Sequence, residues 1–429
     1  MADTRAPVAS GPEVRRAGDI HVVVIGGGGT GAAITHDLIQ RGFRVSLFER
    51  GELTSGTTGR HHGQLHSGAR YAVGDVDIAR ECIEEVRILQ RIAGESIEMN
   101  YGLFLALDDE DEAFAETFES ACSAAGISNR RISIDEALRY EPKINPAARF
   151  AVVVPDGTLD AYRLPMQFFA TAVSGTGADH GPAGYSSPGG AVVRPFTEVV
   201  AVDSRRGNVA GVRVRDLGAA ARASGGGEEF IGADIVINAG GPWAGRIAGL
   251  GGMDLPITPA PGTLVAVKGR LTNMVISRLH PPGDADIIVP QRQLSIVGTT
   301  QWEIEDADSV TTPEEDVDRL LSQGDLLVPS FSSKAFHAAW TAVRPLAGRA
   351  VSNGADASGR RLSRDFEAVS HADEGARGFY SIIGGKATVL RAMGEKVADV
   401  VCDEVGLTIP CRTAETPLLS HRDYFRRKR

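Results

Sequence analysis

Apolar and polar residues near the start of the chain follow the pattern of a strand, a helix and a second strand. Val22–Ile25 is a continuous apolar run rich in β-branched residues, which is typical of a parallel strand buried on both faces. A helix is expected from about Thr30 to Arg41, where Gly42 supplies a stop, and a second strand over Arg44–Phe48. This order predicts an α/β unit built on a parallel sheet.

Three later segments show helical periodicity. Between Asp75 and about Ala93, apolar residues recur every three or four positions, at Ile78, Cys82, Val86, Leu89 and Ile92. A second helix, behind an acidic stretch at 108–112 that suits a helix dipole, is expected to carry Phe114, Phe118 and Cys122. A last helix is expected directly after Gly384-Gly385-Lys386, with one apolar face made of Leu390, Met393, Val397 and Val401.

The middle of the chain is typical of β-structure. Short strands are expected at 151–154, 199–202, 209–214 and 234–238, and a second group at 264–268, 287–289 and 294–298. Because the strand-rich segment 253–342 lies between two α/β segments, we predict an α/β domain with an inserted antiparallel β-sheet cap. We assign 20–93, 148–252 and 343–412 to the α/β domain, 94–147 and 253–342 to the cap, and 1–19 and 413–429 to flexible ends.

Composition and charge exclude several classes of protein. Hydrophobic residues make up 42% and charged residues 23% of the 429 residues, so a disordered or fibrous chain is excluded. A net charge of −10 argues against a nucleic acid partner, and no apolar run approaches the roughly 18 residues of a membrane span. The four cysteines lie far apart and include no C-x-x-C pair, so a reducing cytoplasm is the expected location.

A glycine-rich motif joins the first strand to its helix. Gly26, Gly28 and Gly31 form G-x-G-x-x-G, in which the first glycine allows the tight turn, the second lets a pyrophosphate approach and the third lets helix pack on strand. Glu49 ends the second strand, where an acid can hold a ribose hydroxyl. The order of these features predicts a Rossmann-like dinucleotide-binding domain, but it does not separate FAD from NAD.

The segment Ser55–Tyr71, S-G-T-T-G-R-H-H-G-Q-L-H-S-G-A-R-Y, makes that distinction. Together with the glycine motif it resembles the FAD-dependent glycerol-3-phosphate dehydrogenases, above all the large catalytic subunit of the anaerobic bacterial enzyme, within the D-amino-acid-oxidase-like flavoproteins. The resemblance runs from about residue 20 to 412 and recurs at 154–158, 238–240, 284–290, 296–300, 343–346, 363–364 and 384–386.

The resemblance implies FAD as the cofactor and a two-electron oxidation as the reaction. The expected substrate is sn-glycerol 3-phosphate or a related polyol phosphate, oxidised to the ketone (dihydroxyacetone phosphate for the former), with hydride passing to flavin N5 and then to a quinone or other acceptor. The residues expected to bind FAD are Gly26, Gly28, Gly29, Thr30, Gly31, Glu49, Arg50, Thr57, Thr58, Gly240, Gly384, Gly385 and Lys386. Backbone N–H groups at Gly384-Gly385, which are expected to open the last helix, would favour the negative charge of the reduced ring.

His66 is the candidate base that takes the hydroxyl proton, because histidine titrates near neutral pH and the resembled family carries histidine at this place. The alternative is a histidine that is only hydrogen-bonded within the cofactor loop. His61 and His62 lie close by, but H-H-x-x-x-H in a glycine-rich loop matches no usual zinc pattern, and we expect no metal.

The expected anion clamp consists of arginines from three distant segments. Guanidinium groups grip phosphate with a planar fork, and the resemblance implies this role for Arg70, Arg344 and Arg364. It also places Tyr71, as a hydroxyl donor, and Lys386 in the substrate site. The alternative for each cation is an ordinary surface charge.

Two departures from the family leave the substrate open. Trp340-Thr341-Ala342 replaces the family's Tyr-Ser-Gly, and Leu390 stands where a tyrosine is usual, which would leave room at the substrate's far end. The competing functions are an FAD-dependent 2-hydroxy-acid or amino-acid oxidase or dehydrogenase, and an FAD-binding subunit that only relays electrons. The basic end Phe425–Arg429 leaves open a peripheral contact with the inner face of an anionic membrane, with a solubilising end as the alternative. Oligomeric state is not predicted.

Overall fold

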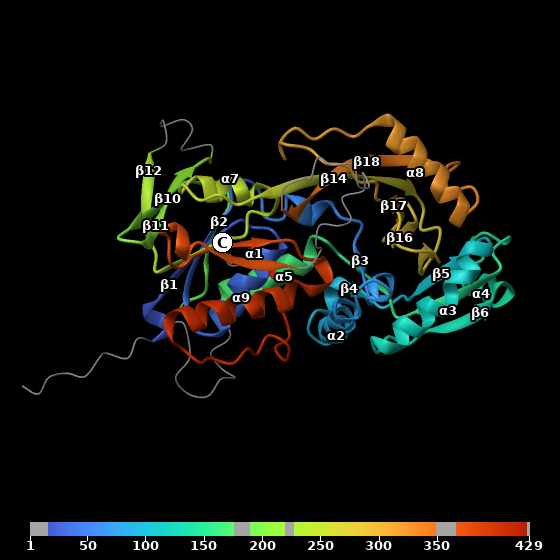
Figure 1. Cartoon of the computed structure of the whole chain (residues 1–429), viewed down its shortest axis with the longest axis horizontal. Coiled ribbons are helices and arrows are strands. Elements are labelled where there is room, and N and C mark those ends of the chain that lie inside the picture. The colour runs from blue at the N-terminus through green and yellow to red at the C-terminus, as the bar shows by residue number, and fades with distance from the viewer. Residues whose placement is uncertain (1–15, 176–188, 219–226, 349–365, 427–429) are drawn as a thin grey trace, which may run out of the picture.

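The computed structural model describes residues 16–175, 189–218, 227–348 and 366–426, which form two parts joined by long strands. Figure 1 shows a nucleotide-binding part around β1 and β2 and a cap part around α3, α8 and β16, with β14 and β18 running between them. The predicted Rossmann-like α/β fold with a β-sheet cap is confirmed.

A six-stranded sheet forms the centre of the nucleotide-binding part. Its strands follow the order β19 (Glu367–Ser370), β20 (Phe379–Ile383), β13 (Ile235–Asn238), β1 (His21–Ile25), β2 (Arg44–Phe48) and β9 (Val192–Arg194). All neighbours are parallel except β19 and β20. The carboxyl ends of β1, β2 and β13 therefore meet at one edge, where ligands of such sheets bind.

Both faces of this sheet are covered, which explains its continuous apolar strands. On one face, Val22 and Val24 pack in a core with helices α1 (Gly29–Gln40), α5 (Arg163–Ser174) and α9 (Leu390–Val405). On the other face, Val23 and Ile25 pack against α7 (Ala244–Gly249) and the antiparallel sheet of β10 (Thr197–Arg205), β11 (Asn208–Asp216) and β12 (Glu228–Gly232). Alternate side chains of a strand point to opposite faces, so both sets are apolar here.

An eight-stranded sheet forms the cap. Its order is β18 (Phe336–Ala347), β14 (Ile257–Lys268), β17 (Leu294–Gly298), β16 (Ile287–Gln291), β15 (Val275–Arg278), β5 (Gly102–Ala106), β7 (Phe150–Val154) and β6 (Arg130–Ser133). Its pairs are antiparallel except β15 with β5. One face packs on α8 (Glu314–Leu327) and α4 (Ile134–Tyr140), while β5 and β7 pack on α3 (Asp109–Ala124) and α2 (Val76–Ile92) from the other side.

A small antiparallel sheet lies where the two parts meet. It consists of β3 (Gln64–Leu65), β8 (Gly157–Leu159) and β4 (Ile97–Glu98). Near the end of the described chain, the short helix α10 (Asp423–Arg426) packs beside α5. None of the described helices has the length and apolar character to cross a membrane.

The structure confirms the strands and helices that the hydrophobic pattern predicted, with one correction at the last helix. α9 begins at Leu390, not directly after Gly384-Gly385, because a single 3-10 turn at Ala387–Val389 intervenes. Elements that the hydrophobic pattern did not reveal include β5, β18, β20, α5 and α8. The domain boundaries stay a prediction, and β7 pairs in the cap sheet although its residues fall within 148–252. Of the predicted flexible ends, 1–15 and 427–429 lie outside the described residues, whereas 413–426 are described: α10 packs beside α5, and the N–H of Leu418 donates to the carbonyl oxygen of Ile92.

Candidate active site

The turn between β1 and α1 leaves no room for side chains. Gly26 has a φ of +108°, and a Cβ there would lie 2.5 Å from the carbonyl oxygen of Ala239. A Cβ on Gly31 would lie 2.0 Å from the carbonyl oxygen of Gly26. Both positions therefore require glycine, the first for its conformation and the second for close packing of helix on strand.

Glu49, just after β2, stabilises this turn through hydrogen bonds to backbone N–H groups. Its carboxylate accepts hydrogen bonds from the backbone N–H groups of Gly27 and Gly51, each at 2.7 Å. The N–H of Gly29, in the first turn of α1, donates to the Thr58 hydroxyl at 2.9 Å. The loop after β2 is thus tied to the glycine turn from two sides.

These elements surround a cavity of about 820 Å³. Its lining includes all the residues predicted to bind FAD except Gly31, namely Gly26, Gly28, Gly29, Thr30, Glu49, Arg50, Thr57, Thr58, Gly240, Gly384, Gly385 and Lys386. Gly31 lies behind the turn, where it lets α1 pack closely. A large cavity beginning at a glycine turn and a helix N-terminus fits a dinucleotide, whose diphosphate needs backbone N–H donors and no intervening Cβ. The individual FAD contacts stay predictions.

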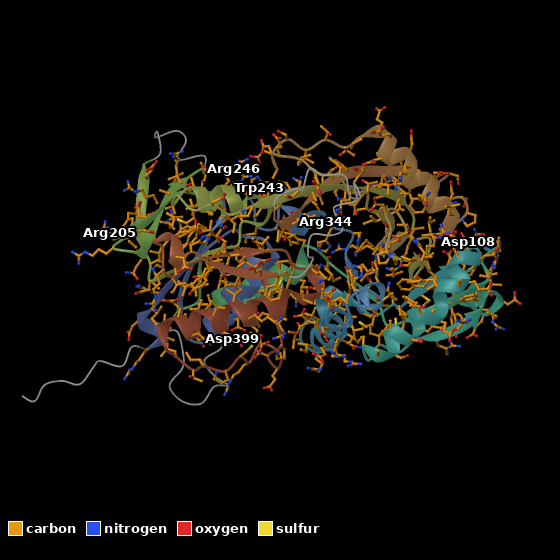
Figure 2. All side chains as sticks on the ribbon, viewed as in Figure 1. Asp108, Arg205, Trp243, Arg246, Arg344 and Asp399 are labelled. Atoms are coloured by element: carbon orange, nitrogen blue, oxygen red, sulfur yellow. The ribbon has the colours of Figure 1, made fainter. Side chains whose placement is uncertain are left out.

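One wall of the cavity joins the predicted Arg50 to three side chains that sequence reasoning missed, those of Trp243, Arg246 and Asp308. The Arg50 guanidinium lies 4.5 Å from the centre of the Trp243 ring, and Asp308 accepts hydrogen bonds from Trp243 at 2.7 Å, Arg246 at 2.6 Å and Arg50 at 3.1 Å. Burial raises the pKa of Asp308, but hydrogen bonds from Arg246, Trp243 and Arg50 outweigh it and lower the pKa to about 2. Figure 2 shows Trp243 and Arg246 close together beside the nucleotide-binding sheet. The N-A-G-G-P-W run marked this segment, but nothing in the sequence linked it to Asp308.

The structure brings His66, Tyr71 and Lys386 together. The centres of the His66 and Tyr71 rings lie 5.3 Å apart, and the Lys386 Nζ lies 5.3 Å from the Tyr71 ring centre. The backbone N–H of His66 donates to the hydroxyl of Thr388 at 3.0 Å. Lys386 also lines the nucleotide cavity, so this cluster lies where the cofactor and substrate regions would meet.

Arg70 is already engaged by a buried carboxylate. Its Nη2 lies 2.7 and 2.8 Å from the two oxygens of Asp286 and 2.7 Å from the carbonyl oxygen of Gly283. Burial raises the pKa of Asp286, but Arg70 and His280 outweigh it and lower the pKa to about 2. The charge of Arg70 is therefore balanced inside the protein, and its role as a phosphate ligand stays a prediction.

Arg344 projects from β18 near the middle of the molecule, as Figure 2 shows. It donates to the Thr299 hydroxyl, and a Cβ on Gly262 would lie 2.9 Å from its Nη1. Burial, followed by the charges of His61, Arg344 and Arg70, lowers the pKa of His62 to about 3, so both arginines act on the same imidazole. Arg364, the third predicted clamp residue, lies outside the described residues.

Both His61 and His62 are held in one tautomer by the backbone. The N–H of Gly63 donates to Nδ1 of His61 at 2.9 Å, and the N–H of Gln64 donates to Nδ1 of His62 at 3.1 Å. Each neutral ring then carries its proton on Nε2. Burial also lowers the pKa of His61 to about 4.

The profile of the family described as "DAO: FAD dependent oxidoreductase" matches residues 21–398 of the chain. The chain belongs to this family of FAD-dependent oxidoreductases. It is 41% identical over 400 residues to a subunit of the anaerobic glycerol-3-phosphate dehydrogenase of Escherichia coli (strain K12), in an alignment that covers 92% of this chain and 69% of the relative.

Solved structures show the same fold for this oxidoreductase. The glycerol-3-phosphate dehydrogenase of Bacillus halodurans, complexed with FAD, has a TM-score of 0.66 at 22% identity and covers 95% of this chain and 70% of its own. Glycine oxidase from Geobacillus kaustophilus has a TM-score of 0.69 at 21% identity and covers 93% and 98%. At these identities the likeness establishes architecture alone.

Two residues at which this oxidoreductase departs from its family's pattern, Leu390 and Trp340, each line a cavity. A Cβ on Gly29 would lie 2.7 Å from Leu390, so Leu390 packs against the glycine turn and lines the nucleotide cavity. The room that the sequence suggested here for the far end of a substrate stays a prediction. Trp340 instead lines a second cavity of about 380 Å³, and its indole N–H donates to the carbonyl oxygen of Arg60 at 2.7 Å.

Proposed function

We propose that this oxidoreductase oxidises sn-glycerol 3-phosphate, or a related polyol phosphate, to the corresponding ketone, which is dihydroxyacetone phosphate for the former. The observation that carries the proposal is the 41% identity across 92% of the chain to a relative named as part of a glycerol-3-phosphate dehydrogenase. The clustering of His66, Tyr71 and Lys386 beside the nucleotide cavity supports it, because oxidation of an alcohol needs a base next to the hydride acceptor.

Arg344 and Lys386 would bind the substrate's phosphate end through charge-assisted hydrogen bonds, with Tyr71 as a hydroxyl donor. Arg364 is the further clamp residue expected from the family resemblance. Arg70 would join them if the phosphate competes with Asp286 for its guanidinium. This grip leaves the hydroxyl-bearing carbon to be directed toward His66.

His66 would take the proton of the substrate hydroxyl while the hydrogen on the same carbon leaves with its electron pair. FAD, when bound, supplies the acceptor for that hydride. Since the proton and the hydride leave together, the C–O bond becomes the carbonyl of the ketone. Lys386 lines the nucleotide cavity and lies beside Tyr71, and its positive charge would favour the negative charge that builds up at the hydride acceptor.

We place the electron acceptor outside this chain. The relative's name designates one subunit of an enzyme, so a partner protein, a quinone or another acceptor would receive the electrons. Because the glycine motif would hold FAD, we expect no transfer of electrons to NAD. The four cysteines are free, as suits the reducing cytoplasm that we propose.

The Arg70–Asp286 pair favours one alternative substrate class. With Arg70 neutralised, fewer arginines remain for the substrate, and one or two suffice for a carboxylate. An FAD-dependent oxidase or dehydrogenase for 2-hydroxy acids or amino acids is the second candidate.

Anaerobic mixing of the FAD-loaded protein with candidate substrates separates the two. Bleaching of the flavin absorbance by glycerol 3-phosphate, with lactate and glycine inactive, is expected. Bleaching by an unphosphorylated hydroxy acid or amino acid, with every polyol phosphate inactive, would contradict the proposal in favour of the alternative. A dye should then reoxidise the flavin, whereas added NAD should give no NADH.

A further inference from the structure

Asp156 is a buried carboxylate that the proposed chemistry does not use. It follows β7, has 2% of its surface exposed and belongs to the V-P-D-G-T run, which has no assigned role. It lies outside the set of residues that line the nucleotide cavity. Because burying a carboxylate is costly unless it is hydrogen-bonded, its partners indicate what it does.

Three donors to Asp156 come from the two sides of His66. The backbone N–H and the hydroxyl of Ser67 donate to Oδ1 at 2.7 and 2.6 Å. The side-chain amide of Gln64 donates to Oδ2 at 2.8 Å. One buried carboxylate thus ties together the residue that follows His66 and the residue two positions before it.

Asp156 accepts these hydrogen bonds at the point where the β-sheet pairing of the chain ends. β3 pairs with β8 through Gln64 with Thr158 and Leu65 with Gly157, so the ladder ends one residue before His66. The His66 N–H donates to the Thr388 hydroxyl, and the next N–H, that of Ser67, donates to Asp156. The backbone of His66 is therefore held between two side-chain anchors.

The same point sets the direction of the following residues. Gly68 has a φ of +98°, and a Cβ there would lie 2.3 Å from the carbonyl oxygen of Ala79, so the chain turns sharply against α2. The turn leads into the 3-10 helix Ala69–Tyr71, which carries Arg70 and Tyr71. Movement at Ser67 would displace both the candidate base and its aromatic neighbour.

We propose that Asp156 is a positioning residue that fixes the backbone on both sides of His66 and thereby aims its imidazole at the substrate hydroxyl. The inference rests on the proposed function, because it takes His66 as the base. Asp156 acts through Gln64 and Ser67 and does not contact the substrate. Misplacing a catalytic group by about 1 Å can cost roughly a hundredfold in rate.

The test compares Asp156→Asn with the wild type in single-turnover flavin reduction. Asparagine keeps the size of the side chain but replaces one acceptor oxygen by an NH₂ group. Either a bond from Ser67 is lost or the Gln64 amide must turn over to accept from that NH₂ group, and the bonds that remain are no longer made to a charged acceptor. At saturating glycerol 3-phosphate, the reduction rate is expected to fall by roughly ten- to a hundredfold, with FAD content unchanged. Affinity for glycerol 2-phosphate as a competitor should fall much less than the rate, because Arg344 and Lys386 lie on other segments and remain in place.

Glu141→Gln is the matched control. Glu141 is also a buried carboxylate, 1% exposed, and accepts the N–H groups of Asn273 and Met274 at 2.7 and 2.6 Å, but it lies in the cap part away from His66. Its replacement should lower the melting temperature while the reduction rate stays that of the wild type. Ser67→Ala removes one donor and keeps the backbone N–H, so it should show a smaller fall in rate than Asp156→Asn. If Asp156→Asn does not fold, Ser67→Ala carries the test.

A substrate-free measurement separates this inference from the proposed function. In the ¹⁵N-histidine NMR spectrum of the FAD-loaded protein, His66→Gln identifies the His66 signals. Asp156→Asn and Ser67→Ala should shift or broaden those signals, and Glu141→Gln should not. If glycerol 3-phosphate fails to reduce the wild type, the proposed function fails while the spectra still test Asp156. Unchanged His66 signals and reduction rates in folded Asp156→Asn or Ser67→Ala protein would overturn the positioning role.

Discussion

The nucleotide cavity and the substrate region differ in what builds them. The cavity begins at a turn made of backbone, where Gly26 and Gly31 approach other main-chain atoms too closely for a side chain. The substrate region is built from side chains, with His66 near the small sheet, Lys386 before α9 and Arg344 on β18. The first region depends on the absence of atoms and the second on the placement of charges.

This difference predicts two kinds of failure. Any side chain added in the glycine turn, polar or apolar, should abolish cofactor binding. The atoms that it meets belong to the backbone, which cannot move aside as a side chain can. Loss of a charge in the substrate region should leave the yellow, folded protein intact and change only how fast the flavin is reduced. Substitutions in each region separate these two outcomes.

The largest effect is expected from Gly31→Ala. Its Cβ would lie 2.0 Å from the carbonyl oxygen of Gly26, so either the turn or α1 must shift and the site expected to hold the diphosphate is lost. The purified protein should be colourless or nearly so, with a lower melting temperature. FAD released on denaturation, measured per protein chain, gives the result.

Gly94→Ala is the control for that substitution. Gly94 is exposed, and no atom lies within 4 Å of an added Cβ, so FAD content should equal that of the wild type. Full FAD occupancy in Gly31→Ala protein would show that the turn yields and that the comparison is wrong on the cofactor side.

Asp286→Asn should give the next largest effect, on stability. Arg70 and Asp286 are 8% and 5% exposed, and removing one partner of a buried ion pair typically costs about 3–5 kcal/mol. The pKa of Asp286 is lowered to about 2 in the folded protein, below the unfolded value of about 3.9. The pair therefore stabilises the fold fully above the unfolded value, and this stabilisation is lost as the pH falls through about 2.

Melting temperatures of the wild type and Asp286→Asn between pH 3 and 7 test this pH dependence. The wild type should melt at a higher temperature than the variant, by a constant amount at pH 5–7 and by less toward pH 3. The same variant releases Arg70, so tighter binding of glycerol 2-phosphate would show that Arg70 can join the clamp. A constant difference at all pH values would contradict an ionised Asp286 as its source.

Arg344→Ala tests directly whether the substrate region depends on the placement of charges. A hydrogen bond to an ionised partner contributes roughly 1.5–3 kcal/mol, so kcat/KM for glycerol 3-phosphate should fall by roughly ten- to a few hundredfold. FAD content should be unchanged. Arg344→Lys keeps the charge but loses the planar fork, so its kcat/KM should lie between those of the wild type and Arg344→Ala. Loss of FAD from either variant would place Arg344 on the cofactor side of the comparison.

The same difference explains how much could be predicted from the sequence. The glycine motif, Glu49 and the flanking strands are consecutive, so their spacing predicted the turn that the structure contains. Arg70 and Asp286 are 216 positions apart, and only the fold reveals that they pair. Asp156 was visible in a family motif, but its partners across β3 were not.

Local patterns were also overlooked. Helix α5 carries a polar stripe at helical spacing, at Arg163, Gln167, Thr171 and Ser174, but a stripe this narrow inside an apolar segment was not recognised as helical. The direction of the Leu390 side chain could not be predicted either, because a family resemblance gives position and not direction. In the structure it packs on Gly29.

The smallest effect is expected from Asp308→Ala, at the edge of the cofactor cavity. Asp308 joins Arg50, Trp243 and Arg246 across that edge, but these groups are roughly half exposed, and exposed ion pairs contribute about 0.2–1 kcal/mol each. FAD should therefore dissociate about two- to fivefold faster, with glycerol 3-phosphate reducing the bound flavin at the wild-type rate. Stopped-flow recovery of flavin fluorescence after dilution measures the dissociation rate.

Glu119→Ala is the control. It breaks the exposed pair between Glu119 on α3 and Arg131 on β6, and it should leave the FAD dissociation rate unchanged. Side chains at the rim would then adjust how long FAD stays, while the glycine turn decides whether it binds; a slower reduction step in Asp308→Ala protein would contradict this separation, because it would connect the rim to the substrate region.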